Sequence, residues 1–168
     1  MDAGILEVIQ TRYAEEQHHY QGHIFNPSEL NENCDLTMEE KKDILFYHDN
    51  LGRWNYFQLL KIPYNADRAA VKKAFSTYSK IFHPDRYFNK NLGSFREKMK
   101  NIYTMMATAN RVLSNEEEKV SYLRELVDKG KVSRKDLRGV TLETPEDLKR
   151  RKEAEERAAR LRTNPMLK

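Results

Sequence analysis

The sequence K-I-F-H-P-D-R-Y-F at residues 80–88 places His83, Pro84 and Asp85 in a row. An imidazole close to a carboxylate is a pair that proteins use for general acid–base chemistry. The same residues can also form a rigid corner between two helices, because proline fixes its own φ and cannot continue a helix. Such a corner would present His83 and Asp85 to a partner protein. The stretch therefore predicts either an enzyme or a docking module.

The neighbouring sequence favours docking over catalysis. A catalytic pair would need a nucleophile or a metal ion and a cleft, and no nucleophile motif lies nearby. The proline between the two residues also disfavours a good His–Asp hydrogen bond. Three histidines and one cysteine elsewhere could bind a metal, but their irregular spacing matches no closed zinc pattern. These residues are His18, His19, His23 and Cys34. We expect no catalytic residues, no metal site and no cofactor.

Two amphipathic helices must position the corner. The first is predicted to be capped by Asn65, with Asp67 near its positive end, and to end before Pro84. Its apolar face contains Val71, Ala74, Phe75, Tyr78, Ile81 and Phe82, whereas Lys72, Lys73 and Lys80 lie on its other faces. The second is predicted over about residues 95–113, after a loop in which Tyr87 and Phe88 serve as anchors. We expect Phe75, Tyr78, Phe82 and Met106 in the core.

The remaining segments also favour helices, so the chain is predicted to be all-α. Thr37 and Glu40 form a capping box that opens a helix over about 38–51, with Gly52 as its stop. A short apolar helix over 56–60 precedes Pro63. Ser114–Glu117 is predicted as a second capping box, opening a helix that stops near Gly130. We divide the chain into an acidic helical extension (1–53), a central domain (54–128), a linker (129–143) and a charged helix (144–168).

Charge is distributed unevenly over the 168 residues. Residues 1–53 hold 4 Lys/Arg against 11 Asp/Glu, residues 54–127 hold 13 against 7, and residues 128–168 hold 13 against 8. The basic middle could be attracted to an acidic partner, and nucleic acid is one such partner. In the C-terminal helix, however, the basic residues alternate with Glu and lack aromatic residues for stacking, which favours a connector helix over a nucleic-acid contact.

No apolar run approaches the roughly 18 residues that a membrane span needs. The N-terminus lacks the layout of a signal peptide, and the single cysteine cannot form an internal disulfide. We therefore expect a cytoplasmic protein that does not contact a membrane.

Six blocks of the central segment follow one another in a recognisable order: Asn55–Leu60, Asn65–Asp67, Val71–Phe75, His83–Arg86, Ala109–Asn115 and Tyr122. With these blocks the segment resembles a J-domain, the module of DnaJ-type co-chaperones, over roughly residues 55–126. The continuation after the His-Pro-Asp corner also resembles a bacterial subset in which a lengthened third helix belongs to a larger multidomain protein. The sequence departs from the family pattern at Lys61, where a glycine is usual, at Ser76 and Thr77, where basic residues are common, and by about one extra turn in the third helix.

The resemblance implies a four-helix domain whose second and third helices form an antiparallel hairpin. It also implies docking on a DnaK-type ATPase chaperone and stimulation of its ATP hydrolysis, with client proteins that the sequence does not identify. The expected partner-binding residues are His83, Pro84, Asp85, Arg86, Lys72, Lys73 and Lys80.

Three alternatives stay open at this stage. The domain could be a degenerate J-like scaffold that recruits another acidic protein, or a helical protein that binds nucleic acid. The acidic N-terminal helices could pack on the basic face and block docking. They could equally be a simple extension, which we favour.

Overall fold

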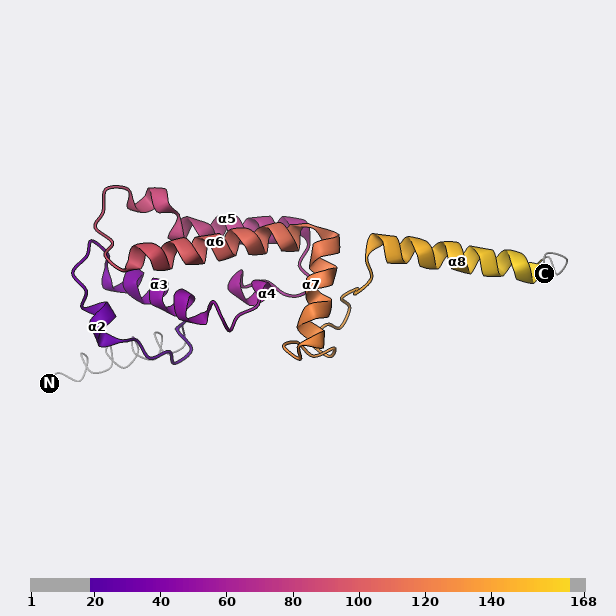
Figure 1. Ribbon diagram of the computed structural model, residues 1–168, viewed down its shortest axis with the longest axis horizontal. Coiled ribbons are helices and arrows are strands. Elements are labelled where there is room, and N and C mark those ends of the chain that lie inside the picture. Colours follow the sequence, from indigo (N-terminus) through magenta and orange to yellow (C-terminus); the bar gives the residue numbers. More distant parts are fainter. Residues whose placement is uncertain (1–18, 164–168) are drawn as a thin grey trace, which may run out of the picture. The chain divides into compact units, whose positions relative to one another are not determined.

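A computed structural model describes residues 19–163, and within this range the prediction of an all-α fold is confirmed. The described chain forms seven α-helices and one 3-10 helix, without a β-strand (Figure 1). The α-helices are α2 (Pro27–Leu30), α3 (Met38–Asn50), α4 (Tyr56–Leu59), α5 (Arg68–Phe82), α6 (Phe95–Ser114), α7 (Glu116–Asp128) and α8 (Pro145–Thr163), and the 3-10 helix is η1 (Pro84–Tyr87).

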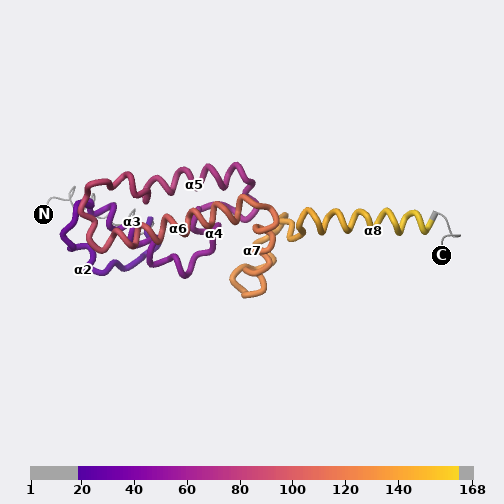
Figure 2. The backbone as a smooth tube through the Cα atoms, turned by 45° about the horizontal axis from the view of Figure 1, so that its top comes forward, coloured from indigo at the N-terminus to yellow at the C-terminus, as the bar shows by residue number. Residues whose placement is uncertain are grey.

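The chain divides into two compact units. Among the described residues, the first contains residues 19–55 together with Ser79–Met105, and the second contains Tyr56–Tyr78 together with residues 106–163. Helices α5 and α6 each contribute to both units. Within each unit their segments lie side by side and run in opposite directions, as Figures 1 and 2 show, so the predicted antiparallel hairpin is confirmed.

The core of the first unit joins α3 to the adjacent ends of α5 and α6. Ile44 and Leu45 are buried on α3, and the Tyr47 ring lies 4.9 Å from the Phe82 ring at the end of α5. Phe95, Met99 and Ile102 are buried on α6. Helix α3 begins with the predicted capping box, because the Thr37 hydroxyl accepts from the Glu40 amide and the Glu40 carboxylate accepts from the Thr37 amide. Helix α3 of the N-terminal segment is therefore part of this core.

The core of the second unit forms around α4, α6 and α7. Its fully buried side chains include Phe57, Leu60, Val71, Met106, Leu113 and Leu123. The Tyr56 amide donates to the Tyr122 hydroxyl over 3.1 Å, and the two rings stack at 4.4 Å. Between α7 and α8, Val132 and Leu137 are buried, so this segment contributes apolar side chains to the core of its own unit.

Lys61 ends α4 in the left-handed conformation, with φ of 53°. The Ile62 amide donates to the Phe57 carbonyl and the Lys61 amide to the Gln58 carbonyl, which is the hydrogen-bond pattern of a Schellman motif. This motif favours glycine at the left-handed position. The Lys61 ammonium lies 5.3 Å from the centre of the Tyr78 ring, a cation–π contact that compensates part of the strain.

Two predicted helix caps were wrong by one or two residues. Asp67, not Asn65, caps α5, because its carboxylate accepts from the Ala70 amide over 2.8 Å. Asn115, not Ser114, caps α7, and its side chain accepts from the amides of Glu117 and Glu118. In both cases several cap-forming residues lie close together, and the register of the buried apolar face decides which one stands at the helix end.

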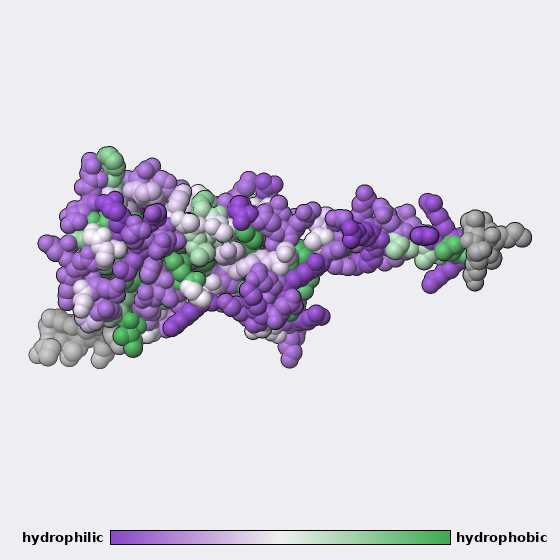
Figure 3. All heavy atoms as spheres, in the orientation of Figure 1, coloured by the Kyte–Doolittle hydropathy of each residue, from purple (hydrophilic) through white to green (hydrophobic). Residues whose placement is uncertain are grey.

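The predicted core was correct for Phe82 and Met106, which are buried, whereas Phe75 and Tyr78 are only half-buried. Most of the surface visible in Figure 3 is hydrophilic, in keeping with the 33% of charged residues in the sequence.

Candidate docking site

The His-Pro-Asp corner is a capped turn at the end of α5. His83 leaves the helical conformation with φ of −67° and ψ of 131°, as expected for a residue that precedes proline. Pro84 is the first residue of η1, where its missing amide costs no hydrogen bond. The Asp85 amide donates to Nδ1 of His83 over 3.2 Å, so the imidazole itself caps the turn. The corner therefore holds its shape through local bonds.

His83 and Asp85 are presented to solvent in different ways. The Asp85 side chain is 89% exposed. The His83 ring is partly covered, and it meets the Tyr103 ring edge-on at 5.2 Å between ring centres. The His83 Nδ1 lies 3.6 Å from the nearer Asp85 carboxylate oxygen, too far for a hydrogen bond. Because Nδ1 accepts from the Asp85 amide, this arrangement does not form a His–Asp catalytic dyad.

Tyr87 anchors the turn, and Phe88 does not. Tyr87 is buried, its hydroxyl donates to the Ile81 carbonyl over 3.0 Å, and burial raises the pKa of its phenol. Phe88 is 79% exposed, so its predicted anchoring role was wrong. Consecutive side chains in this turn point in different directions, so only one of the two neighbouring rings can face the core. Asn89 follows with φ of 62°, a left-handed conformation that asparagine adopts more readily than most residues.

We name residues 83–94 the docking loop. Four acidic residues of the N-terminal segment hold this loop and the first turn of α6. We name Glu29, Glu32, Asp35 and Glu40 the acidic clamp. Glu40 lies 3.4 Å from the Arg86 guanidinium, and Glu29 lies 3.1 Å from the Lys98 ammonium.

The middle of the clamp binds the backbone. Asp35 exchanges two hydrogen bonds with Asn91: its carboxylate accepts from the Asn91 amide over 2.6 Å, and its own amide donates to the Asn91 carbonyl over 2.8 Å. Glu32 accepts from both the amide and the hydroxyl of Ser94, and these hydrogen bonds lower the pKa of its carboxyl group. From the charge asymmetry of the sequence, packing of the acidic segment on the basic one was an open alternative that we did not favour, and the sequence does not show which residues meet.

Helix α5 exposes the predicted basic residues. Lys72, Lys73 and Lys80 are all exposed, with Lys80 in the first unit and the other two in the second. Lys73 and Lys80 are seven residues apart and therefore share one helix face. Ser76 and Thr77 lie between them, and the Thr77 hydroxyl donates to the Lys73 carbonyl over 3.0 Å. The positive charge along this face is thus interrupted at its middle.

Three basic residues of α8, Lys149, Arg150 and Arg151, are paired with acidic residues of the same helix. Arg150 lies 2.7 Å from Glu146, and Arg151 contacts Glu155. At the start of the helix, Arg124 contacts Asp147 over 2.7 Å and donates to the Leu142 carbonyl. Hydrogen bonds from Thr144 and Arg124 lower the pKa of Asp147 to about 2. This charge pattern is that of a solvated helix.

Residues 19–163 contain no cluster of three His, Cys, Asp or Glu side chains that could bind a metal ion. His19 and His23 instead face Asp43 and Asp49, while His18 lies outside the described residues. In the same range no helix is both long and apolar enough to span a membrane.

A family model of the DnaJ domain matches residues 55–122. The chain is also similar to the chaperone protein DnaJ of Campylobacter jejuni subsp. jejuni and of Campylobacter jejuni strain RM1221, each 33% identical over 70 residues. These matches cover 42% of this chain and 17% of each relative. No solved structure matches the chain. Helices α4, α5 and α6 and the first part of α7, with the His-Pro-Asp turn between α5 and α6, fall in this region, so residues 55–122 of the chain match the J-domain family.

Proposed function

We propose that this protein is a co-chaperone that docks on a DnaK-type ATPase chaperone and stimulates its ATP hydrolysis. The DnaJ-domain match supports the family, and the geometry of Asp85 is the observation that carries the proposal. Its carboxylate is 89% exposed on a turn that is already ordered. A pre-ordered group loses less conformational entropy when it binds, which increases affinity.

Asp85 is the proposed acceptor for a cationic group of the partner, because charge-assisted hydrogen bonds to a carboxylate are stronger than neutral ones. Lys72, Lys73 and Lys80 would attract an acidic surface and increase the association rate more than the affinity. Arg86 has a different role in this proposal, since its guanidinium already lies against Glu40. ATP binding and hydrolysis belong to the partner, and this chain contributes no catalytic group.

Steady-state ATP turnover by a DnaK-type chaperone tests the proposal. We expect the wild type to stimulate turnover and Asp85→Asn and His83→Gln to fail, because truncating one partner of a buried charge pair costs roughly 2–5 kcal/mol. Asp128→Asn is the matched control, since Asp128 is exposed at the end of α7. Absence of stimulation by the wild type at any concentration would refute the proposal and favour the scaffold that recruits another acidic protein.

The acidic extension is proposed to be a structural part of the first unit and not an inhibitor. Deleting residues 1–53 is a poor test, because it removes the buried Ile44 and Leu45. Glu40→Gln tests the question without opening the core, since it removes the negative charge that faces Arg86, while the glutamine side-chain oxygen can still accept from the Thr37 amide in the capping box. We expect unchanged ATPase stimulation, whereas increased stimulation would show that the clamp restrains docking.

A further inference from the structure

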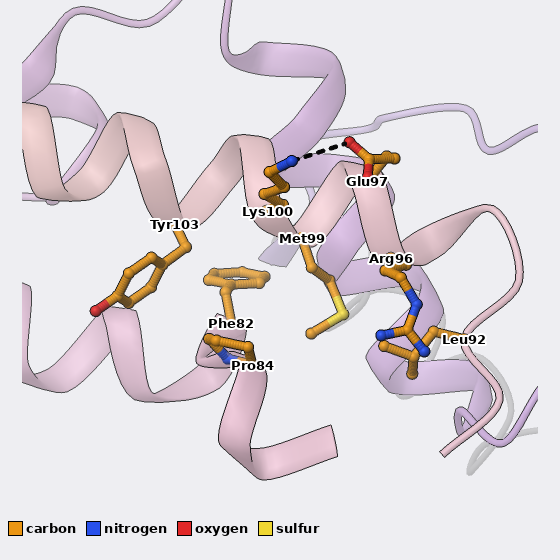
Figure 4. Close-up of a pocket in the computed structure, with 8 residues that line it drawn as sticks. All are labelled: Phe82, Pro84, Leu92, Arg96, Glu97, Met99, Lys100 and Tyr103. Carbon is orange, nitrogen blue, oxygen red and sulfur yellow. Dashed lines mark ion pairs between the residues drawn. The ribbon is translucent and has the colours of Figure 1, made fainter. Parts of the chain in front are cut away.

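A pocket of about 440 Å³ opens beside the docking loop within the first unit (Figure 4). Its floor is formed by Phe82, Leu92 and Met99, which are buried. Pro84 and Tyr103 form further walls, so the pocket adjoins the His-Pro-Asp turn directly. Volumes of about 300–1,000 Å³ are typical of pockets that bind small ligands.

The rim of the pocket is charged and mainly basic. Arg96 and Lys100 lie on it with Glu97, which gives two cations and one anion. Lys100 and Glu97 are 3.9 Å apart, and both side chains are more than 70% exposed. An exposed pair of this kind contributes little energy, so Lys100 can exchange Glu97 for another carboxylate. The Arg96 guanidinium lies 3.5 Å from the Lys90 carbonyl, at the long limit of a hydrogen bond.

The shape of the pocket depends on the acidic clamp. Leu92 lies between Asn91 and Ser94, the two points at which Asp35 and Glu32 bind the loop backbone. These bonds hold the loop side of the pocket in place. Met99, on the opposite helix, has a flexible and polarisable side chain that adapts to different apolar groups. The pocket is therefore lined by Leu92, on a loop that hydrogen bonds hold in place, and by the adaptable side chain of Met99 on α6.

We propose that this pocket receives an apolar side chain from an acidic segment of the ATPase chaperone. The apolar floor selects the side chain, and the two rim cations select carboxylates next to it. Pro84 connects the pocket to the turn that presents Asp85, so one partner can occupy both at once. This inference rests on the proposed function, and it adds an apolar anchor to a contact otherwise made of charges. Buried apolar anchors of this kind contribute much of the energy of protein interfaces.

Charge reversal on the rim tests the proposal in the full chain. We expect Arg96→Glu/Lys100→Glu to raise the concentration for half-maximal ATPase stimulation about tenfold, equivalent to about 1.4 kcal/mol. The control is Lys152→Glu/Arg157→Glu, which makes the same change in net charge at exposed positions of α8. The control should shift the curve by less than about twofold, because neither residue lines the pocket.

Methionine methyl NMR observes the pocket without relying on ATPase stimulation. The Met99 signal is assigned with Met99→Leu, a substitution that conserves volume. We expect this signal to shift when the DnaK-type chaperone is added to the wild type, and to shift much less in the rim variant. A shift that appears on concentrating the protein alone would instead identify a second copy as the occupant and overturn the proposal.

The ATPase assay and the Met99 NMR signal together distinguish the pocket proposal from the proposed function. If the wild type stimulates ATP turnover but the rim variant behaves like its control, the pocket proposal is wrong and the proposed function stands. If the wild type fails to stimulate but Met99 shifts with the chaperone, the proposed function is wrong and the pocket is a binding site for that chaperone. If the chaperone leaves the Met99 signal unchanged, the pocket proposal is wrong whatever the ATPase result.

Discussion

Replacing Gly93 with alanine adds one methyl group at the point where the acidic clamp meets the docking loop. Gly93 has φ of 50°, and a Cβ built on it would lie 1.9 Å from Oε1 of Glu32. Two separate costs therefore arise. The left-handed backbone costs roughly 1–2 kcal/mol for a residue with a side chain. The overlap also forces the Glu32 carboxylate away from Ser94, whose amide and hydroxyl donate to it.

The two costs can be separated with a double-mutant cycle. In a Glu32→Ala background the carboxylate is absent, so Gly93→Ala should cost only the backbone term, or roughly 2–8 °C in melting temperature for a domain of this size. In the wild type the same substitution should cost clearly more. The assay is thermal unfolding of all four proteins followed by circular dichroism, with the coupling taken from the difference between the two backgrounds.

A coupling of zero would refute the reasoning. It would mean that Glu32 does not lie against Gly93 in solution, and that the clamp does not hold the loop at this point. The cycle should be repeated at high salt, where we expect the coupling to persist. A hydrogen-bonded carboxylate in contact with backbone is less sensitive to screening than a distant charge pair.

Three further predictions concern the second unit. Lys61→Gly should raise stability by about 1 kcal/mol, because it relieves a left-handed residue; a lower melting temperature would contradict this. The pKa of Asp147 is lowered from 3.8 to about 2. Its stabilising contacts should therefore be complete above about pH 4 and be lost as the pH falls through about 2. The Thr144 amide donates to Asp147, and an NMR titration of this amide with its midpoint at about pH 4 would contradict the prediction. Lys119→Met should lower the free energy of unfolding, measured by chemical denaturation, by about 1–3 kcal/mol. The reason is that the buried ammonium donates to the Ala66 carbonyl over 2.7 Å, and its loss leaves that carbonyl without a donor. An unchanged denaturation midpoint would contradict this and show that water replaces the ammonium.

The local order of the chain could be predicted from sequence because its signals act over a few residues. The capping box at Thr37 and Glu40 and the stop imposed by Pro84 both depend on backbone geometry within one or two turns. The face of α5 and α6 that packs inward also follows from helical periodicity. For the same reason the residue pattern alone places the His-Pro-Asp turn between two amphipathic helices.

The caps show where local signals are insufficient. Asn65 and Asp67 are both good cap residues, and Ser114 and Asn115 are as well. Tertiary packing chooses between them, because the buried face of each helix sets the residue at which the helix can begin. The same applies to Tyr87 and Phe88, where only the surrounding core decides which ring is buried.

By itself the sequence determined the helices, the His-Pro-Asp corner and the resemblance to a J-domain, since all three depend on short-range patterns. Only the tertiary structure decided that α3 belongs to a core with Phe82, that Glu32 and Asp35 hold the docking loop, and that a pocket opens beside Pro84. These contacts join residues up to 62 positions apart. Such pairs leave no periodic trace in the sequence, because their distance in space is set by the packing of whole helices.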